Sequence, residues 1–222
     1  ATVVDKIIRY ETKPEPGGWN SRQLFVADNP DSAGNFYNEA DEGYSQVTAP
    51  FTGQRFYYNP SPSNQPYFYT DPVQLRNSFL NNFRAGAGLI IFHGHSSWLQ
   101  WAVEELFRYH WSSDPALNDV VTLNNGYRLP VVLGMTCFTA SFHRPEYNTL
   151  DESLLNRSGG GAVAVWGSTG LGVATGHTSL QKGFYQAIYG PDQKNLGAAT
   201  LAGKMELYST GFNHAAPRLP HH

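Results

Sequence analysis

Two short apolar runs of the sequence end at side chains that can do chemistry. Residues 89–92 lead directly to His93 and His95, and residues 129–136 lead to Cys137, the only cysteine of the 222-residue chain. Short apolar runs bounded by glycine or polar residues are typical of buried strands. Because parallel strands end at one edge of a sheet, where ligands bind, we expect the histidines and the cysteine to meet there.

A thiol and an imidazole at one sheet edge are the parts of a nucleophile and its acid/base partner. The thiolate attacks a carbonyl, the histidine handles the proton on the leaving group, and backbone N–H groups hold the oxyanion. Cys137 supplies the thiol, and either His93 or His95 supplies the imidazole. Gly94 has no side chain, so we expect the N–H groups of Gly94 and Cys137 to be the oxyanion donors.

A metal site is the first competing interpretation, because His93-x-His95 is a familiar ligand spacing. The pair is followed by Ser96, Ser97 and Trp98, without the aspartate or further histidine that dinuclear hydrolases place nearby. We therefore expect no metal. Further ligands would have to come from His143, His177 or Cys137.

A serine hydrolase and a noncatalytic module would both do without cysteine chemistry. A serine hydrolase would need a Gly-x-Ser-x-Gly turn, and residues 167–170 (Gly-Ser-Thr-Gly) resemble it only in part. A noncatalytic α/β module, in which the two histidines and the cysteine are packed, stays open on position alone, since free cysteine is among the most buried residues.

The pattern around these strand ends alternates between apolar strands and amphipathic helices. This alternation predicts a three-layer α/β domain with helices on both faces of a mostly parallel sheet. For the helix at 2–10 we expect a buried face of Val3, Val4, Ile7 and Ile8. Strands are expected at 22–27, 54–58, 89–92, 128–136 and 162–166; further helices at 35–46, 72–85, 149–157, 178–189 and 195–208; weaker helical segments at 103–111 and 115–121; and loops at 59–69 and 167–176.

Composition narrows the class of protein. Aromatic residues make up 14% and charged residues 15% of the chain, which describes a folded globule rather than a disordered segment. A net charge of −3 without a basic stretch argues against nucleic acid as a partner. No apolar run approaches the roughly 20 residues of a membrane span. A single cysteine excludes an intrachain disulfide.

Four stretches within residues 4–208 form an ordered set. They are a helix at 4–11, a strand and acidic turn at 24–36, the run Phe92-His93-Gly94-His95-Ser96-Ser97 with Trp101 after it, and a segment from Met135-Thr136-Cys137 to the glycine-rich residues 160–170. In order and spacing they resemble the gingipain-like cysteine peptidases, family C25 of the caspase-like clan.

The resemblance implies a caspase-like α/β/α sandwich and a dyad of nucleophile and base. Cys137 would be the nucleophile that forms a thioester acyl-enzyme. His95 would be the general acid/base, because it follows Gly94 as the family histidine follows its glycine. The chain departs from the family pattern at the next position, where the family glycine is replaced by Ser96.

The resemblance also points to a substrate pocket. In arginine-specific members an aspartate lines the first specificity pocket, and the corresponding loop here is roughly 28–41. Asp31 is the first candidate for this role, followed by Asp28 and Asp41. The alternative for these acidic residues is that they form turns or bind a structural calcium ion; catalysis itself needs no cofactor. Further residues expected to line the pocket are Trp98, Trp166, Gly167 and Ser168.

For the chain as a whole we expect one caspase-like peptidase domain over 1–222, lacking part of the family's amino-terminal region. Its tail at 213–222 ends in two histidines and is interpreted as tag-derived at the end. Family members are commonly secreted as larger precursors, so we expect a secreted or cell-surface endopeptidase acting on proteins or peptides, with other precursor domains as partners. The alternative is a noncatalytic binding or structural module with a peptidase-like fold.

Overall fold

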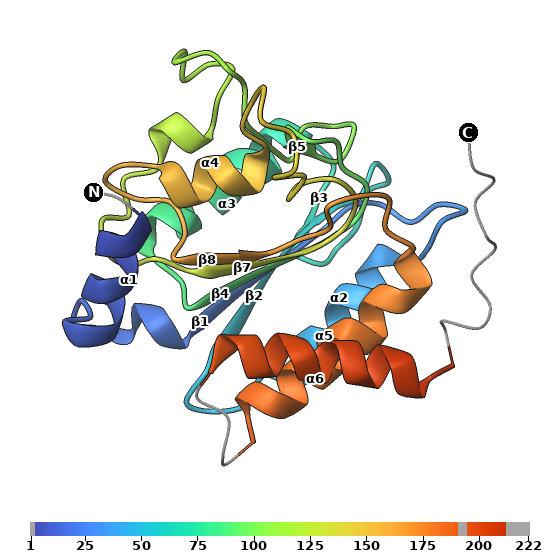
Figure 1. The fold of residues 1–222 in the computed structure, drawn as a ribbon. Helices are drawn as coiled ribbons and strands as arrows, with labels where there is room; N and C mark the ends of the chain where they lie inside the picture. Colours follow the sequence, from blue (N-terminus) through green and yellow to red (C-terminus); the bar gives the residue numbers. More distant parts are fainter. Residues whose placement is uncertain (1–2, 191–194, 212–222) are drawn as a thin grey trace.

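A six-stranded sheet forms the middle layer of the computed structural model, which describes residues 3–190 and 195–211 (Figure 1). The strands lie in the order β3-β2-β1-β4-β7-β8, and every neighbouring pair is parallel. The tail at 213–222 lies outside the described residues. The strands are β1 (Arg22–Ala27), β2 (Thr52–Tyr58), β3 (Phe68–Tyr69), β4 (Leu89–His93), β7 (Val131–Met135) and β8 (Ala164–Trp166).

Helices cover both faces of this sheet (Figure 1). One face is covered by α3 (Pro72–Ala85) and α4 (Leu150–Asn156), and the other by α2 (Phe36–Tyr44), α5 (Ala174–Ile188) and α6 (Leu196–Ser209). Successive side chains of a strand point to opposite faces, so Leu24 joins the first core and Phe25 the second. Burial on both faces explains why the strands are continuous apolar runs. The predicted three-layer α/β/α sandwich with a parallel sheet is confirmed.

Helix α1 (Val3–Thr12) forms where it was predicted, but its apolar side is not buried. Val4 is 62% and Ile8 54% exposed, whereas Lys6 is buried. The Lys6 ammonium donates to the carbonyl of Leu155 at 2.8 Å, near the carboxyl end of α4, where helix carbonyls attract a cation. Burial lowers the pKa of Lys6 to about 8. The predicted apolar face is therefore wrong, and a buried cation attaches α1 instead.

The segment predicted as helical over 103–111 instead contains the turn and the second strand of an antiparallel hairpin, whose strands are β5 (Gln100–Trp101) and β6 (Phe107–Arg108). Tertiary packing overrides the helical pattern, because the Trp101 ring stacks on Phe92 at 4.6 Å. The hairpin turn contains positive φ angles at Ala102 and Glu105, which a helix does not adopt.

Three smaller features complete the fold. Short 3-10 turns occur at Gly18–Ser21 (η1) and Val120–Thr122 (η2). The expected loop at 59–69 ends in the edge strand β3, and α5 begins at Ala174, four residues before the predicted start. Within residues 3–190 and 195–211, no helix has the length and apolar character needed to cross a membrane.

Candidate active site

The topology brings the two strand ends together at the carboxyl edge of the sheet. Strand β4 pairs with β7 so that His93 lies opposite Met135. His95 lies two residues after His93, and Cys137 lies two residues after Met135. Both residues therefore follow inner strands of the sheet, near the middle of its carboxyl edge.

Ser96 connects the two segments at this edge. Its hydroxyl oxygen accepts a hydrogen bond from the Cys137 N–H at 3.0 Å and contacts the Cys137 carbonyl. The Thr136 hydroxyl lies 2.7 Å from the same oxygen and 2.6 Å from the carbonyl oxygen of Gly94. In this structure the Cys137 N–H, one of the expected oxyanion donors, is therefore occupied by Ser96.

Cys137 lies in a loop that pairs with the glycine-rich loop after β8. The N–H of Phe138 donates to the Gly170 carbonyl at 2.9 Å, and the N–H of Ala140 to the Ser168 carbonyl at 3.1 Å. Next to these bonds, the Gly172 N–H donates to Cys137 Sγ at 3.3 Å. The thiol is half-buried, and its position is set by the Gly172 peptide.

A side chain at position 172 would disturb this contact. A Cβ there would lie 2.7 Å from the Thr136 carbonyl oxygen and 2.9 Å from Nε2 of His177. Gly172 is therefore required by close packing beneath the Cys137 thiol. The sequence placed Gly172 in the expected loop at 167–176 without indicating this contact.

His95 is anchored by its backbone and by one ring nitrogen. Its N–H donates to the Asp28 carboxylate at 3.2 Å, and its carbonyl accepts from the Ala102 N–H at 2.8 Å. Ring atom Nε2 lies 2.8 Å from Oδ2 of Asp31. The Phe36 ring packs edge-on against the imidazole at 5.3 Å between centroids. Among the described contacts, Nδ1 is left as the ring nitrogen without a hydrogen bond.

Two carboxylates thus hold His95, in different states of burial. Burial raises the pKa of Asp28 to about 6. The backbone N–H groups of His95 and Asn29 donate to this carboxylate and partly offset the rise in pKa. The N–H of Ala33 and the His95 side chain lower the pKa of Asp31, which is exposed. The sequence indicated Asp31 for a substrate pocket; the structure places its carboxylate on His95.

His93, the other histidine of the motif, is fully buried. Its Nε2 lies 2.8 Å from Oε1 of Gln181 and its Nδ1 3.3 Å from the Glu39 carboxylate. Gln181 also donates to the Glu39 carbonyl at 2.9 Å. His93 therefore belongs to a polar network between β4, α2 and α5, whereas the His95 side chain is 44% exposed.

The remaining expected pocket residues divide between the two loops and the core. Trp98 is half-buried, and its ring lies 5.8 Å from that of Phe138, the residue after Cys137. Trp166 packs on Phe184 at 5.7 Å, in the layer of α5. The Ser168 hydroxyl donates to the Gly170 carbonyl at 2.5 Å within its own loop.

Gly167 makes room for a buried acid beneath the loop that carries Cys137. A Cβ at Gly167 would lie 2.2 Å from Oδ2 of Asp151, which accepts from the Thr139 hydroxyl at 3.0 Å. Burial raises the pKa of Asp151 to about 7. This carboxyl supports the loop from below rather than facing a substrate.

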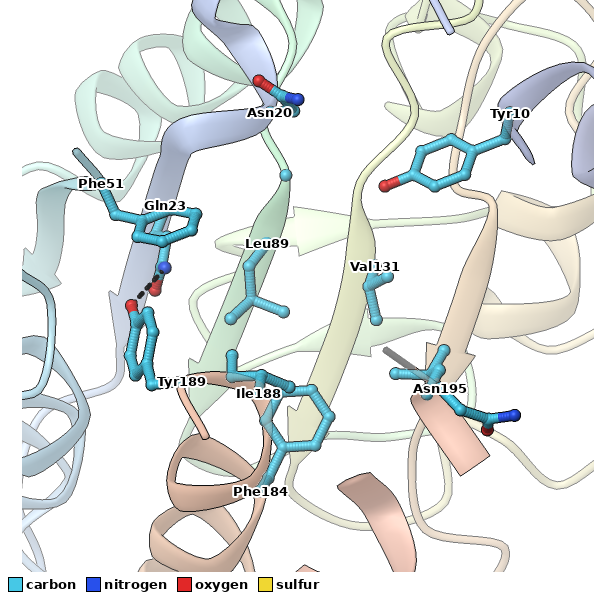
Figure 2. A pocket seen from close by; sticks show the side chains of 12 residues that line it. Tyr10, Asn20, Gln23, Phe51, Leu89, Val131, Phe184, Ile188, Tyr189 and Asn195 are labelled. Atoms are coloured by element: carbon cyan, nitrogen blue, oxygen red, sulfur yellow. Dashed lines mark hydrogen bonds between the residues drawn. The ribbon is translucent and has the colours of Figure 1, made fainter. Parts of the chain in front are cut away.

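A cavity of about 320 Å³ lies at the opposite, amino edge of the sheet (Figure 2). The first residues of strands line it, among them Leu89 and Val131, together with Phe184. The Gln23 amide donates to the Tyr189 hydroxyl at 2.7 Å, shown as a dashed line in Figure 2. Its described lining contains no cysteine, histidine or carboxylate, whereas the carboxyl edge holds both Cys137 and His95.

No group of three or more histidine, cysteine, aspartate or glutamate side chains is arranged to hold a metal ion in the part of the chain that the structure describes. His93 and His95, which the sequence offered as a pair of metal ligands, instead contact Gln181 and Asp31.

Comparison with known proteins gives a family and a fold. The sequence model of peptidase family C25 matches residues 1–219. No curated protein matches the chain by sequence.

Similar solved structures include gingipain R (RgpB), described as an Arg-specific cysteine proteinase. It is 18% identical with a TM-score of 0.73 over 94% of this chain and 47% of that one. A complex of the pro- and mature domains of RgpB from Porphyromonas gingivalis is 17% identical with a TM-score of 0.75, over 95% and 48%. A structure described only as a protease is 18% identical with a TM-score of 0.69, over 98% and 48%. The chain spans about half the length of these structures.

Proposed function

The chain belongs to peptidase family C25, and from that premise we propose that it is a cysteine endopeptidase with Cys137 as nucleophile and His95 as general acid/base. The observation that carries the proposal is the placement of an accessible imidazole and a half-buried thiol at the ends of neighbouring strands β4 and β7.

In the proposed reaction the Cys137 sulfur forms a bond to the scissile carbonyl carbon, and the thiol proton passes to His95. Collapse of the tetrahedral intermediate breaks the C–N bond, while His95 returns the proton to the departing amine. The product is a thioester. A water molecule, deprotonated by His95, then attacks the thioester and releases the acid and the thiol. The steps need no cofactor.

Thiol and imidazole make no hydrogen bond to each other among the described contacts, since Sγ bonds to Gly172 and Nε2 to Asp31. This separation suits a mechanism in which the substrate amide sits between them. We assign Asp31 as a positioning residue, because its carboxylate contacts Nε2 and thereby orients the ring with Nδ1 free.

The oxyanion would form at the N–H groups of Cys137 and Gly94. For this, the Ser96 hydroxyl must leave the Cys137 N–H, since that donor is occupied without substrate. The oxyanion is a stronger acceptor than a neutral hydroxyl, so we expect it to displace Ser96.

The occupied N–H is also the observation that favours a second candidate, a noncatalytic binding module. If Ser96 stayed in place, the site would lack one oxyanion donor, at a cost of about 10²–10³ in rate. Activity measurements separate the two candidates.

We further propose that residues 1–222 act as one peptidase domain of a secreted or cell-surface protein, on protein or peptide substrates and together with other domains of a precursor. The family and the half-length match to solved structures support this assignment.

The test is cleavage of a quenched-fluorescent peptide library by wild type, Cys137→Ala and His95→Ala. We expect each substitution to lower kcat/KM by at least about a thousandfold. His143→Ala is the matched control, an exposed histidine in the loop after the nucleophile, and should behave as wild type. Cleavage by the Cys137→Ala protein would reject the proposal.

A further inference from the structure

Two exposed aliphatic side chains flank the peptide that contacts the nucleophile. Leu171 is 68% and Val173 57% exposed, and Gly172 between them donates to Cys137 Sγ. Side chains alternate in an extended segment, and Val173 has extended dihedral angles. Because a Cβ at Gly172 would point inward at Thr136, the two neighbours point outward beside the thiol.

The surface around these side chains carries no charge in the loops that form it. Residues 137–142 and 168–174 contain no acidic or basic residue. The Phe138 ring adds apolar surface and contacts Trp98. The first charge beyond them is the guanidinium of Arg144, which lies over the Trp98 ring at 4.2 Å. The two loops therefore hold no carboxylate that could pair with a basic substrate side chain.

Asp151 is buried beneath the loop that carries Cys137, and the other acids named at the site lie on the other side of His95. Asp31 is engaged with the imidazole. Glu104 interacts electrostatically with Asp28, which follows β1, and with Tyr58, the last residue of β2. Leu171 instead follows β8, the edge strand at the far end of the sheet.

We propose that the first specificity pocket takes an aliphatic or aromatic substrate side chain, held against Leu171 and Val173. This inference rests on the proposed function and names its substrate class. The residue on the acyl side of the cleaved bond is covalently closest to Cys137, and its side chain reaches the apolar surface beside the sulfur. Removing one Leu or Val from water on binding favours such substrates by about tenfold or more.

The test measures rates of covalent labelling by three peptidyl acyloxymethyl ketones that differ only in the first residue: leucine, arginine or aspartate. We expect the leucine probe to label wild type at least about tenfold faster than the arginine or aspartate probe. Leu171→Asp and Val173→Asp should slow the leucine probe by about tenfold and speed the arginine probe. Thr169→Asp places the same charge in the same loop, further from the sulfur, and should change either rate less than about threefold.

The outcomes distinguish the pocket assignment from the peptidase assignment. Faster labelling by the arginine or aspartate probe, with the label lost in Cys137→Ala, would overturn the pocket assignment and leave the peptidase assignment standing. Leu171→Asp and Val173→Asp rates equal to wild type would also overturn the pocket. Absence of labelling by all three probes, together with no library cleavage, would overturn both.

Discussion

Replacing Gly172 with alanine tests whether the position of the nucleophile depends on close packing beneath it. The new Cβ would lie 2.7 Å from the Thr136 carbonyl oxygen and 2.9 Å from Nε2 of His177, against 3.4 Å or more for an ordinary contact. Neither neighbour can yield easily, because one is backbone and the other is a buried ring. The segment around Gly172 must therefore move by roughly 0.5–1 Å, and Cys137 Sγ moves with it.

A misplacement of about 1 Å costs about a hundredfold in rate. We therefore expect Gly172→Ala to lower kcat/KM by about 10- to 100-fold, while overpacking lowers the free energy of unfolding by about 1–3 kcal/mol. Peptide cleavage with active-site titration gives the rate per competent site, and urea unfolding gives the stability.

Gly170→Ala is the matched control, because a Cβ at Gly170 meets nothing within 4 Å. It lies in the same loop and should retain both activity and stability. Activity of Gly172→Ala equal to that of Gly170→Ala would refute the reasoning, since the nucleophile would then tolerate a displaced Gly172 peptide.

Three further substitutions probe the neighbours of the dyad. Ser96→Ala should raise kcat/KM several-fold, because the Cys137 N–H is freed for the oxyanion, and a fall in kcat/KM would contradict this. The lost hydrogen bond should lower the free energy of unfolding by about 1 kcal/mol. Asp31→Asn should lower kcat about tenfold in steady-state assays, and an unchanged kcat would contradict the positioning role of Asp31. Because the side chains of Asp31 and His95 are both more than 40% exposed, the substitution should change the free energy of unfolding by less than about 1 kcal/mol. Asp151 keeps its proton up to about pH 7 when folded but loses it near its ordinary pKa when unfolded, so its contribution to stability is lost as pH rises from about 4 to 7. Urea unfolding at pH 5 and pH 8 should show wild type losing stability relative to Asp151→Asn, and parallel curves would contradict the assignment.

The fold could be predicted largely because both faces of its sheet are buried. Continuous apolar runs marked β1, β4 and β7, and their alternation with helices set the layers. The hairpin of β5 and β6 could not be predicted from periodicity, because Trp101 is placed by its stacking on Phe92 and not by a local pattern. The orientation of α1 was missed because one buried lysine determines it.

The site shows the same division between local and tertiary information. The positions of His95 and Cys137 could be predicted from the ends of two apolar strands, because the topology of parallel strands alone brings these ends to one edge of the sheet. The contact of Asp31 with His95 joins residues 64 positions apart and depends on the path of a loop. The contact of Gly172 with the thiol depends likewise on how the two loops pair.

The central claim, that Cys137 is an acylated nucleophile, is tested most directly by trapping the acyl-enzyme. The protein is mixed with an activated peptide ester, quenched in acid within the first turnover, and analysed by intact mass and peptide mapping. We predict that wild type carries one acyl group on Cys137, which forms faster than it is hydrolysed. We predict no adduct in Cys137→Ala. Turnover of the ester without any adduct, or an adduct of the same yield in Cys137→Ala, would contradict the claim.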